Sequence, residues 1–192
     1  DGSNCDQWIS FASQVSSLNN SLPNVNIVDS QVVTSSMLGT RTQPKIAIIN
    51  GATRVTNHGN IIRSTSEIET NAKGSGIMLV QYDSQTFTRT ASATQKNFYY
   101  EGLVIMYGDE WATLRLKGED MVYGGVVMLS GSDDSTLLER FAVRNFSNMF
   151  YSKAATDQAN LALGSIGISY PVTDTSDSRN STVTIGWYED YN

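Results

Sequence analysis

Residues 6 to 22 place apolar side chains at the three- and four-residue spacing of an amphipathic α-helix, with polar side chains on the other face. Asn4 or Asp6 can cap the start of this helix, and Pro23 ends it because proline cannot continue the hydrogen-bond ladder. The apolar positions are Trp8, Phe11, Ala12, Val15, Leu18 and Leu22. The pattern predicts an N-terminal helical segment, residues 1–23, ahead of the remaining chain.

Runs of alternating apolar and polar residues follow the helix and predict β-strands. The clearest local pattern is centred on Asn50-Gly51, because Asn and Gly tolerate the positive φ values of a two-residue type I′ turn. It predicts a β-hairpin between 45–49 and 52–56. Together with these two, the strands expected in this part of the chain are 25–33, 61–70 and 77–90.

Three more strands with the same alternation are expected in the centre of the chain, at 98–107, 111–117 and 121–130. Each is followed by a turn that combines glycine with acidic residues. Short turns of this kind are typical of an antiparallel meander, and the alternation in 111–117 indicates one buried and one solvated face. We therefore expect an antiparallel sheet here.

Helical spacing returns at 136–153, where Thr136-Leu137-Leu138-Glu139 matches a capping box and predicts a second helix. Two final strands are expected at 165–172 and 181–188. No internal repeat of solenoid length is evident. The expected fold is mainly β (α+β): an antiparallel sheet or sandwich of about nine to ten strands with two helices, in a single β-rich domain at 24–192.

Charged residues make up only 17% of the 192 residues, against about 25% in an average soluble domain, and Ser, Thr and Asn are abundant. A surface of neutral polar side chains suits a protein that stands close to neighbouring copies of itself. The formal net charge of -6 argues against nucleic acid as a partner, because such binding depends on Lys and Arg. No apolar run approaches the roughly twenty residues that span a bilayer.

Residues with catalytic chemistry are few. His58 is the only histidine and Cys5 the only cysteine, so we expect no His or Cys metal site and no cofactor. No Gly-X-Ser-X-Gly segment presents a serine nucleophile. The strongest catalytic candidates are acid pairs in turns, since glycosidases use two carboxylates. These pairs are Asp109-Glu110, Glu119-Asp120 and Asp133-Asp134.

Turn formation and solubility explain the acid pairs more simply than catalysis does. Consecutive turns of a meander lie at opposite ends of the sheet, which separates the first pair from the second. A calcium site at Asp133 and Asp134, or at Asp174 and Asp177, is a less favoured alternative, because no EF-hand spacing supports it. We therefore predict that the protein is not an enzyme and binds no metal.

Three groups of residues are candidates for contact or modification. The expected assembly interface lies on the N-terminal helix and consists of Cys5, Trp8, Phe11, Val15 and Leu18. Candidate glycosylation sites are Asn19, Asn145 and Asn180, each in an Asn-X-Ser/Thr triplet. Candidate ligand or interface aromatics are Trp111, Trp187 and Tyr188.

These features favour an extracellular, cell-surface or virion-surface structural subunit that assembles with copies of itself, by analogy of layout with a pilin-like filament or capsid-type protein. One alternative is a secreted adhesin or carbohydrate-binding module that binds a host or surface glycan. A second alternative is a secreted glycoside hydrolase using turn carboxylates. The chain starts at Asp1 rather than Met, so we expect an N-terminal segment to have been removed, and a membrane contact only through such a segment.

Overall fold

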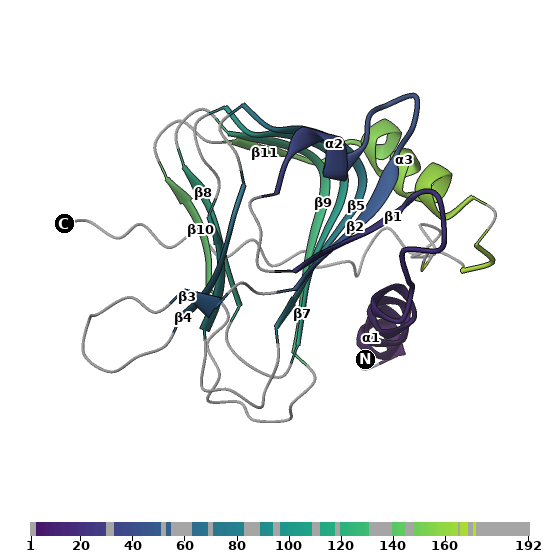
Figure 1. The fold of residues 1–192 in the computed structure, drawn as a ribbon, viewed down its shortest axis with the longest axis horizontal. Coiled ribbons are helices and arrows are strands. Elements are labelled where there is room, and N and C mark those ends of the chain that lie inside the picture. Colours follow the sequence, from purple (N-terminus) through teal and green to yellow (C-terminus); the bar gives the residue numbers. More distant parts are fainter. Residues whose placement is uncertain are drawn as a thin grey trace.

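Parallel strands alternate between two sheets, and the two longer helices cover one face of the larger sheet (Figure 1). The computed structural model describes residues 3–29, 33–50, 53–54, 63–68, 71–82, 89–93, 97–108, 112–117, 120–130, 140–144, 148–164, 166–168 and 171. The helices are α1 (Ser3–Ser16), α2 (Ser35–Leu38) and α3 (Lys153–Leu163). The strands are β1 (Val25–Asp29), β2 (Lys45–Asn50), β3 (Thr53–Arg54), β4 (Arg63–Glu67), β5 (Lys73–Tyr82), β6 (Arg89–Ala93), β7 (Tyr99–Gly108), β8 (Ala112–Lys117), β9 (Met121–Ser130), β10 (Arg140–Arg144) and β11 (Asn148–Phe150).

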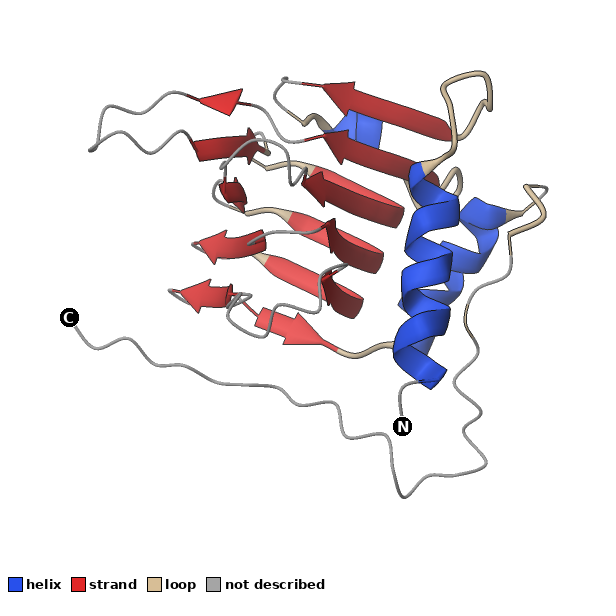
Figure 2. Cartoon of the chain, turned by 90° about the horizontal axis from the view of Figure 1, so that it is seen from below, coloured by secondary structure: helices blue, strands red, loops and turns tan. Residues whose placement is uncertain are grey.

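The larger sheet has six strands in the order β1-β2-β5-β7-β9-β11, and every neighbouring pair is parallel. The smaller sheet has five strands in the order β10-β8-β6-β4-β3, and only β3 runs antiparallel to its neighbour. Figure 2 shows the strands of the two sheets as two columns, with the two longer helices beside the six-stranded sheet. An all-parallel sheet covered by helices is an α/β-like arrangement.

Consecutive strands from β4 onward belong alternately to the two sheets, so each circuit of the chain adds one strand to each sheet. The register repeats regularly: Lys73 pairs with Tyr99, Tyr99 with Met121, and Met121 with Asn148. Successive coils therefore take 26, 22 and 27 residues. The expectation that the chain has no repeat of solenoid length is wrong.

The predicted antiparallel sheet or sandwich is also wrong. Strands do lie close to the three central positions that alternation predicts, but β7 and β9 are parallel neighbours and β8 lies in the other sheet. Alternation along a strand is the same in both kinds of sheet and cannot distinguish them. Parallel neighbours require a long crossover, and here β8 and its flanking connections supply that crossover between β7 and β9.

Two local predictions fail for the same reason, because strand pairing with distant residues outweighs local sequence signals. Asn50 ends β2, which pairs with β1 and β5, whereas β3 pairs with β4, so the two segments form no hairpin. The helix expected at 136–153 is replaced by β10 and β11, and α3 begins only after them. Its proposed capping box at 136–139 lies outside the described residues.

The N-terminal helix is confirmed as α1, although it ends at Ser16, well before Pro23. The short strand expected at 25–33 corresponds to β1. At the other end of the chain, 166–168 and 171 belong to no strand, and 181–188 lies outside the described residues.

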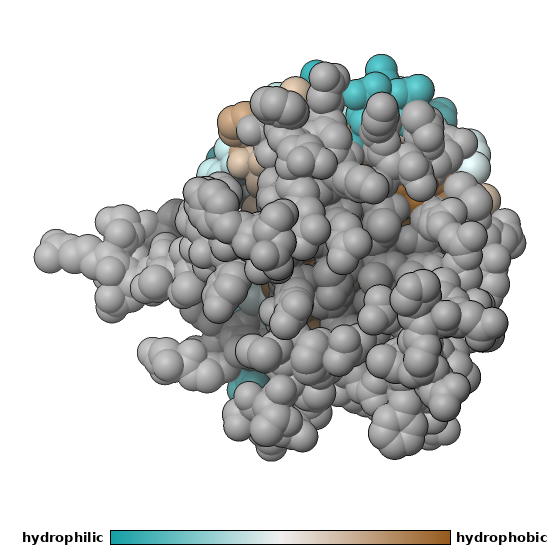
Figure 3. Space-filling view, turned by 90° about the vertical axis from the view of Figure 1, so that its left-hand side faces the viewer, coloured by the Kyte–Doolittle hydropathy of each residue, from teal (hydrophilic) through white to brown (hydrophobic). Residues whose placement is uncertain are grey.

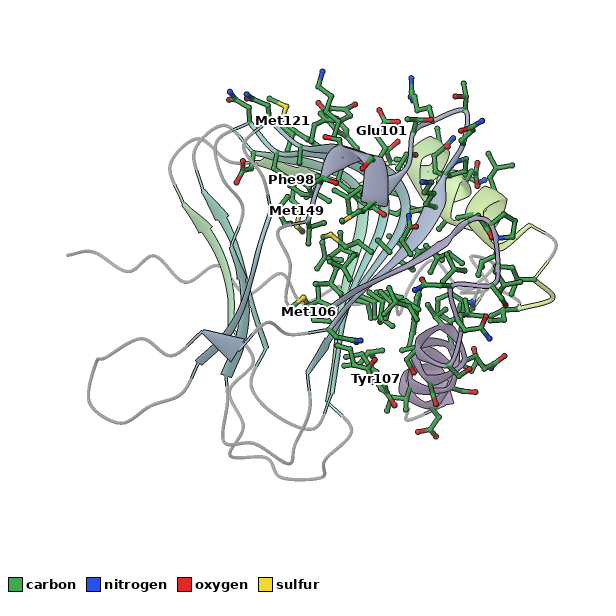
Figure 4. All side chains as sticks on the ribbon, in the orientation of Figure 1. Phe98, Glu101, Met106, Tyr107, Met121 and Met149 are labelled. Carbon is green, nitrogen blue, oxygen red and sulfur yellow. The ribbon has the colours of Figure 1, made fainter. Side chains whose placement is uncertain are left out.

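Both faces of the six-stranded sheet are buried, which explains its nearly continuous apolar strands. On β7, Leu103 and Ile105 face α1 and α3, while Val104 and Met106 face the smaller sheet. We call these two layers the helix-side core and the inner core. Figure 4 shows Met106 and Phe98 between the two sheets and Tyr107 beside α1.

A column of three glycines crosses the six-stranded sheet where Gly76, Gly102 and Gly124 pair in register. Their φ values are 121°, 142° and 129°, in the region that favours glycine. A Cβ on Gly102 would lie 2.0 Å from the carbonyl oxygen of Gly76, and one on Gly124 would lie 1.9 Å from that of Gly102. The strands bend near their amino ends in Figure 1. At the column, only glycine lets each strand backbone lie so close to the carbonyl oxygen of its neighbour.

We predict that Gly102→Ala lowers the free energy of unfolding by roughly 3 kcal/mol or more, because both the backbone conformation and the space exclude a methyl group. Urea denaturation followed by circular dichroism measures this. Gly125→Ala is the matched control, since its Cβ would meet the nearest side-chain atom, of Leu103, at 3.4 Å. An equal loss of unfolding free energy in the two variants would contradict a special role for the glycine column.

Candidate functional site

Three aromatic rings contact one another across neighbouring strands just before the glycine column: Tyr99 and Tyr123 are tilted at 45° to each other, and Tyr123 and Phe150 are stacked. Tyr99 on β7 lies 5.4 Å from Tyr123 on β9, and Tyr123 lies 5.2 Å from Phe150 on β11, at an interplanar angle of 22°. These centroid separations are close to the roughly 4.8 Å between strands, so the rings follow the strands as a ladder. We call Tyr99, Tyr123 and Phe150 the aromatic row.

The aromatic row ends at an exposed edge of the sheet. Phe150 is 45% exposed, and its neighbours Met149 and Tyr151 are 37% and 81% exposed. Among the described residues, only Leu161 on α3 is a further exposed large hydrophobic side chain. Figure 3, which views the molecule from the side of the five-stranded sheet, shows hydrophobic atoms at its upper left and hydrophilic atoms at its upper right.

A buried carboxylate lies beside the row. Glu101 is only 5% exposed and is aligned with Tyr123 in the sheet. One of its oxygens accepts a hydrogen bond from the Tyr99 hydroxyl, and the other forms an ion pair with the Arg41 guanidinium. A buried charge needs such partners to offset its lost hydration. Both oxygens of Glu101 are therefore engaged within the chain.

The environment of Tyr99 changes its acidity. Burial raises the pKa of Tyr99 to about 12, and the hydrogen bond to Glu101 and the negative charge of Glu101 act in the same direction. The neighbouring Arg41 lowers this pKa by a smaller amount. Tyr99 is therefore a neutral hydrogen-bond donor across the physiological pH range.

Polar groups at the strand starts have structural partners. Asp120, the described member of the predicted acid pairs, is fully buried and accepts a hydrogen bond of 2.8 Å from the Phe98 backbone amide. In the equivalent turns, Asn71 and Asn97 adopt positive φ, and the Asn97 side chain donates to that of Asn71 at 3.0 Å. Asp120 thus fixes a turn of the coil. The other acid-pair residues and the alternative calcium ligands lie outside the described residues.

A shallow hollow of about 290 Å³ opens at the same end of the sheet. Its lining comes from the strand starts and consists of Lys73, Asn97, Phe98, Tyr99 and Met121. The described residues contain no group of three or more His, Cys, Asp or Glu side chains that could hold a metal ion. The hollow offers mainly apolar contact beside one amine and one amide.

The expected assembly interface on α1 is used for packing within the chain. Phe11 and Val15 are buried in the helix-side core, and Trp8 and Leu18 pack against it. Cys5 lies in the first turn of α1, but its side chain is outside the described part. An assembly surface therefore has to be sought elsewhere than at Phe11 and Val15.

Of the other predicted sites, the structure places one. Asn19 is exposed after α1, and its side-chain oxygen accepts hydrogen bonds from the backbone amide of Ser21, at 3.0 Å, and from the Ser21 hydroxyl. The sites outside the described residues are His58, Asn145, Asn180, Trp111, Trp187 and Tyr188.

Sequence reasoning missed Glu101 and the role of Phe150, yet a signal for them was present. The segments Lys73–Tyr82, Tyr99–Gly108 and Met121–Ser130 each carry glycine at their fourth position, followed by mainly apolar residues. Aligning these glycines places Ser75, Glu101 and Tyr123 in one row. Strand pairing then adds Phe150 to it.

No helix among the described residues is both long and apolar enough to cross a membrane. No protein-family model, curated protein or solved structure matches the chain. Function must therefore be inferred from the chain's own geometry.

We predict that Glu101→Gln lowers the pKa of Tyr99 from about 12 toward its usual value of 10, because the variant loses the negative charge. Tyrosine-resolved NMR titration measures this, with Tyr99→Phe assigning the signal. Since unfolded tyrosine ionises near pH 10, the stabilisation linked to Tyr99 is complete below pH 10 and is lost as pH rises toward 12. An unchanged Tyr99 titration in Glu101→Gln would contradict the contribution assigned to the charge of Glu101.

Asp120→Ala should lower the free energy of unfolding by about 1–3 kcal/mol, because it leaves the buried Phe98 amide without its acceptor. Asp120→Asn keeps an acceptor oxygen, so we expect it to lower the free energy of unfolding less than Asp120→Ala does. Asp157→Ala is the control, since its pair with Lys153 is exposed, and such pairs contribute about 0.5 kcal/mol or less. Chemical denaturation measures all three variants, and an Asp120→Ala value as small as that of the control would refute the structural role.

Proposed function

We propose that the protein is a non-catalytic structural subunit of a cell or virion surface that associates with copies of itself. The observation that carries this proposal is the edge of the six-stranded sheet at β11. There, the exposed side chains Met149, Phe150 and Tyr151 follow one another along the chain. Exposed strand edges of this kind readily pair with another chain.

The composition supports self-association over binding to a highly charged partner. The segment Asn148–Ser152 contains no charged residue, so two copies can approach here without like-charge repulsion. Charged residues also make up only 17% of the whole sequence, which favours close approach between copies. Aromatic residues and methionine are also enriched at protein interfaces.

Glycan binding is the second candidate, and the exposure of Tyr151 favours it. Aromatic rings stack on the apolar faces of sugars, and Tyr151 is 81% exposed beside Phe150. A single exposed patch of this kind serves an adhesin as well as an assembly subunit.

Sedimentation velocity over a wide range of protein concentrations tests the proposal. We expect a reversible shift from monomer to a larger species as concentration rises, because the contact is a small apolar edge. A protein that remains monomeric up to the highest soluble concentration refutes self-assembly. Binding on a glycan array that Tyr151→Ala abolishes would then identify the adhesin.

A further inference from the structure

The two outer edges of the six-stranded sheet differ in how their backbone groups are satisfied. The Ile46 amide donates to the Asn24 carbonyl at 2.8 Å, so the backbone of residue 24 faces β2. Backbone groups of consecutive residues point to opposite sides of a strand, so those of Val25 and Ile27 face away from β2. Together with Asp29 they form the outward side of β1.

Residues of the preceding turn already occupy two of the outward amide donors of β1. The Val25 amide donates to the Leu22 carbonyl at 3.1 Å, and the Ile27 amide donates to the Asn20 side-chain oxygen at 2.7 Å. A strand from another molecule would have to displace both bonds. The turn therefore caps the β1 edge, a device by which proteins prevent edge-to-edge pairing.

The β11 edge has no comparable cap among the described residues. No described strand lies beyond β11 in the sheet order, and the chain leaves it directly into α3, whose first turn is capped by Ser152. Phe150 also leaves the aromatic row exposed at this edge. The described sheet thus has one capped edge and one edge that presents apolar side chains.

We propose that two copies associate through their β11 edges about a two-fold axis, so that the two sheets continue antiparallel across the interface. This inference rests on the proposed self-association and specifies its symmetry. Head-to-tail growth would pair the β11 edge of one copy with the β1 edge of the next. The turn that caps the β1 edge opposes that pairing. A contact between identical edges closes on itself, so the product is a dimer.

The two-fold contact brings the aromatic rows of the two copies together at Phe150. It also brings an uncharged segment, Asn148–Ser152, against its own copy. The two-fold axis is perpendicular to the sheet. It reverses the direction of the strands but leaves each face of the sheet on the same side, so the two α3 helices lie on the same face of the joined sheet. Strand addition of this kind combines backbone hydrogen bonds with side-chain contacts.

Single-cysteine cross-linking tests the symmetry in the full chain. In a Cys5→Ser background, Asn148→Cys, Met149→Cys and Phe150→Cys are each oxidised under mild conditions. Two-fold antiparallel pairing places a residue of this strand opposite its own copy, with Cα atoms about 5 Å apart, which suits a disulfide. We expect a covalent dimer from at least one of the three variants, and far less from Leu161→Cys, which lies on α3 and is 60% exposed.

Sedimentation of Phe150→Lys complements the cross-linking, because two lysines would meet at the axis. We expect the dimer dissociation constant to rise at least tenfold, with Leu161→Lys unchanged and circular dichroism confirming that both variants are folded. If the wild type associates but no edge cysteine cross-links, or if it forms species larger than a dimer, the two-fold inference is overturned while self-association stands. If the wild type stays monomeric, the proposed function itself fails.

Discussion

Backbone-to-backbone contact at the glycine column is the constraint on which the rest of the structure depends. Gly76, Gly102 and Gly124 let each strand lie against the carbonyl oxygen of the one before it, at separations that admit no side chain. Because the column fixes the register of β5, β7 and β9, it also fixes which side chains share a row. The aromatic row and the alignment of Glu101 with Tyr123 both follow from that register.

The local elements were largely readable from the sequence, but their arrangement was not. Alternation located β7, β8 and β9 because burial on a pleated strand has period two whatever the direction of its neighbour. Whether two neighbouring strands are parallel or antiparallel depends on where the chain goes after each strand. The turns that combine glycine with acidic residues resemble those of a meander, so they favoured the antiparallel interpretation. The helical spacing in 136–153 misled because Phe141 and Met149 lie in strands paired with β8 and β9. Pairing with residues far along the chain is invisible to a local pattern.

The candidate site shows the same contrast: its residues can be read from the sequence, but the contacts between them cannot. The contact between the rings of Tyr99 and Tyr123 depends on strands that are 22 residues apart in register, so no local pattern reveals it. Asp120 was considered as a catalytic acid because its neighbours are acidic, whereas its burial and its bond to the Phe98 amide give it a role in the turn. A carboxylate's function depends on its surroundings, which composition does not report.

The unequal lengths of the coils have a consequence for how this fold can vary. The coils take 26, 22 and 27 residues, yet the three strands that carry the glycines remain aligned. The differences are therefore absorbed outside the paired positions of the six-stranded sheet. Insertions and deletions in those connections leave the glycine register intact, so peptide tags or foreign loops can be grafted there while the sheet keeps its spacing.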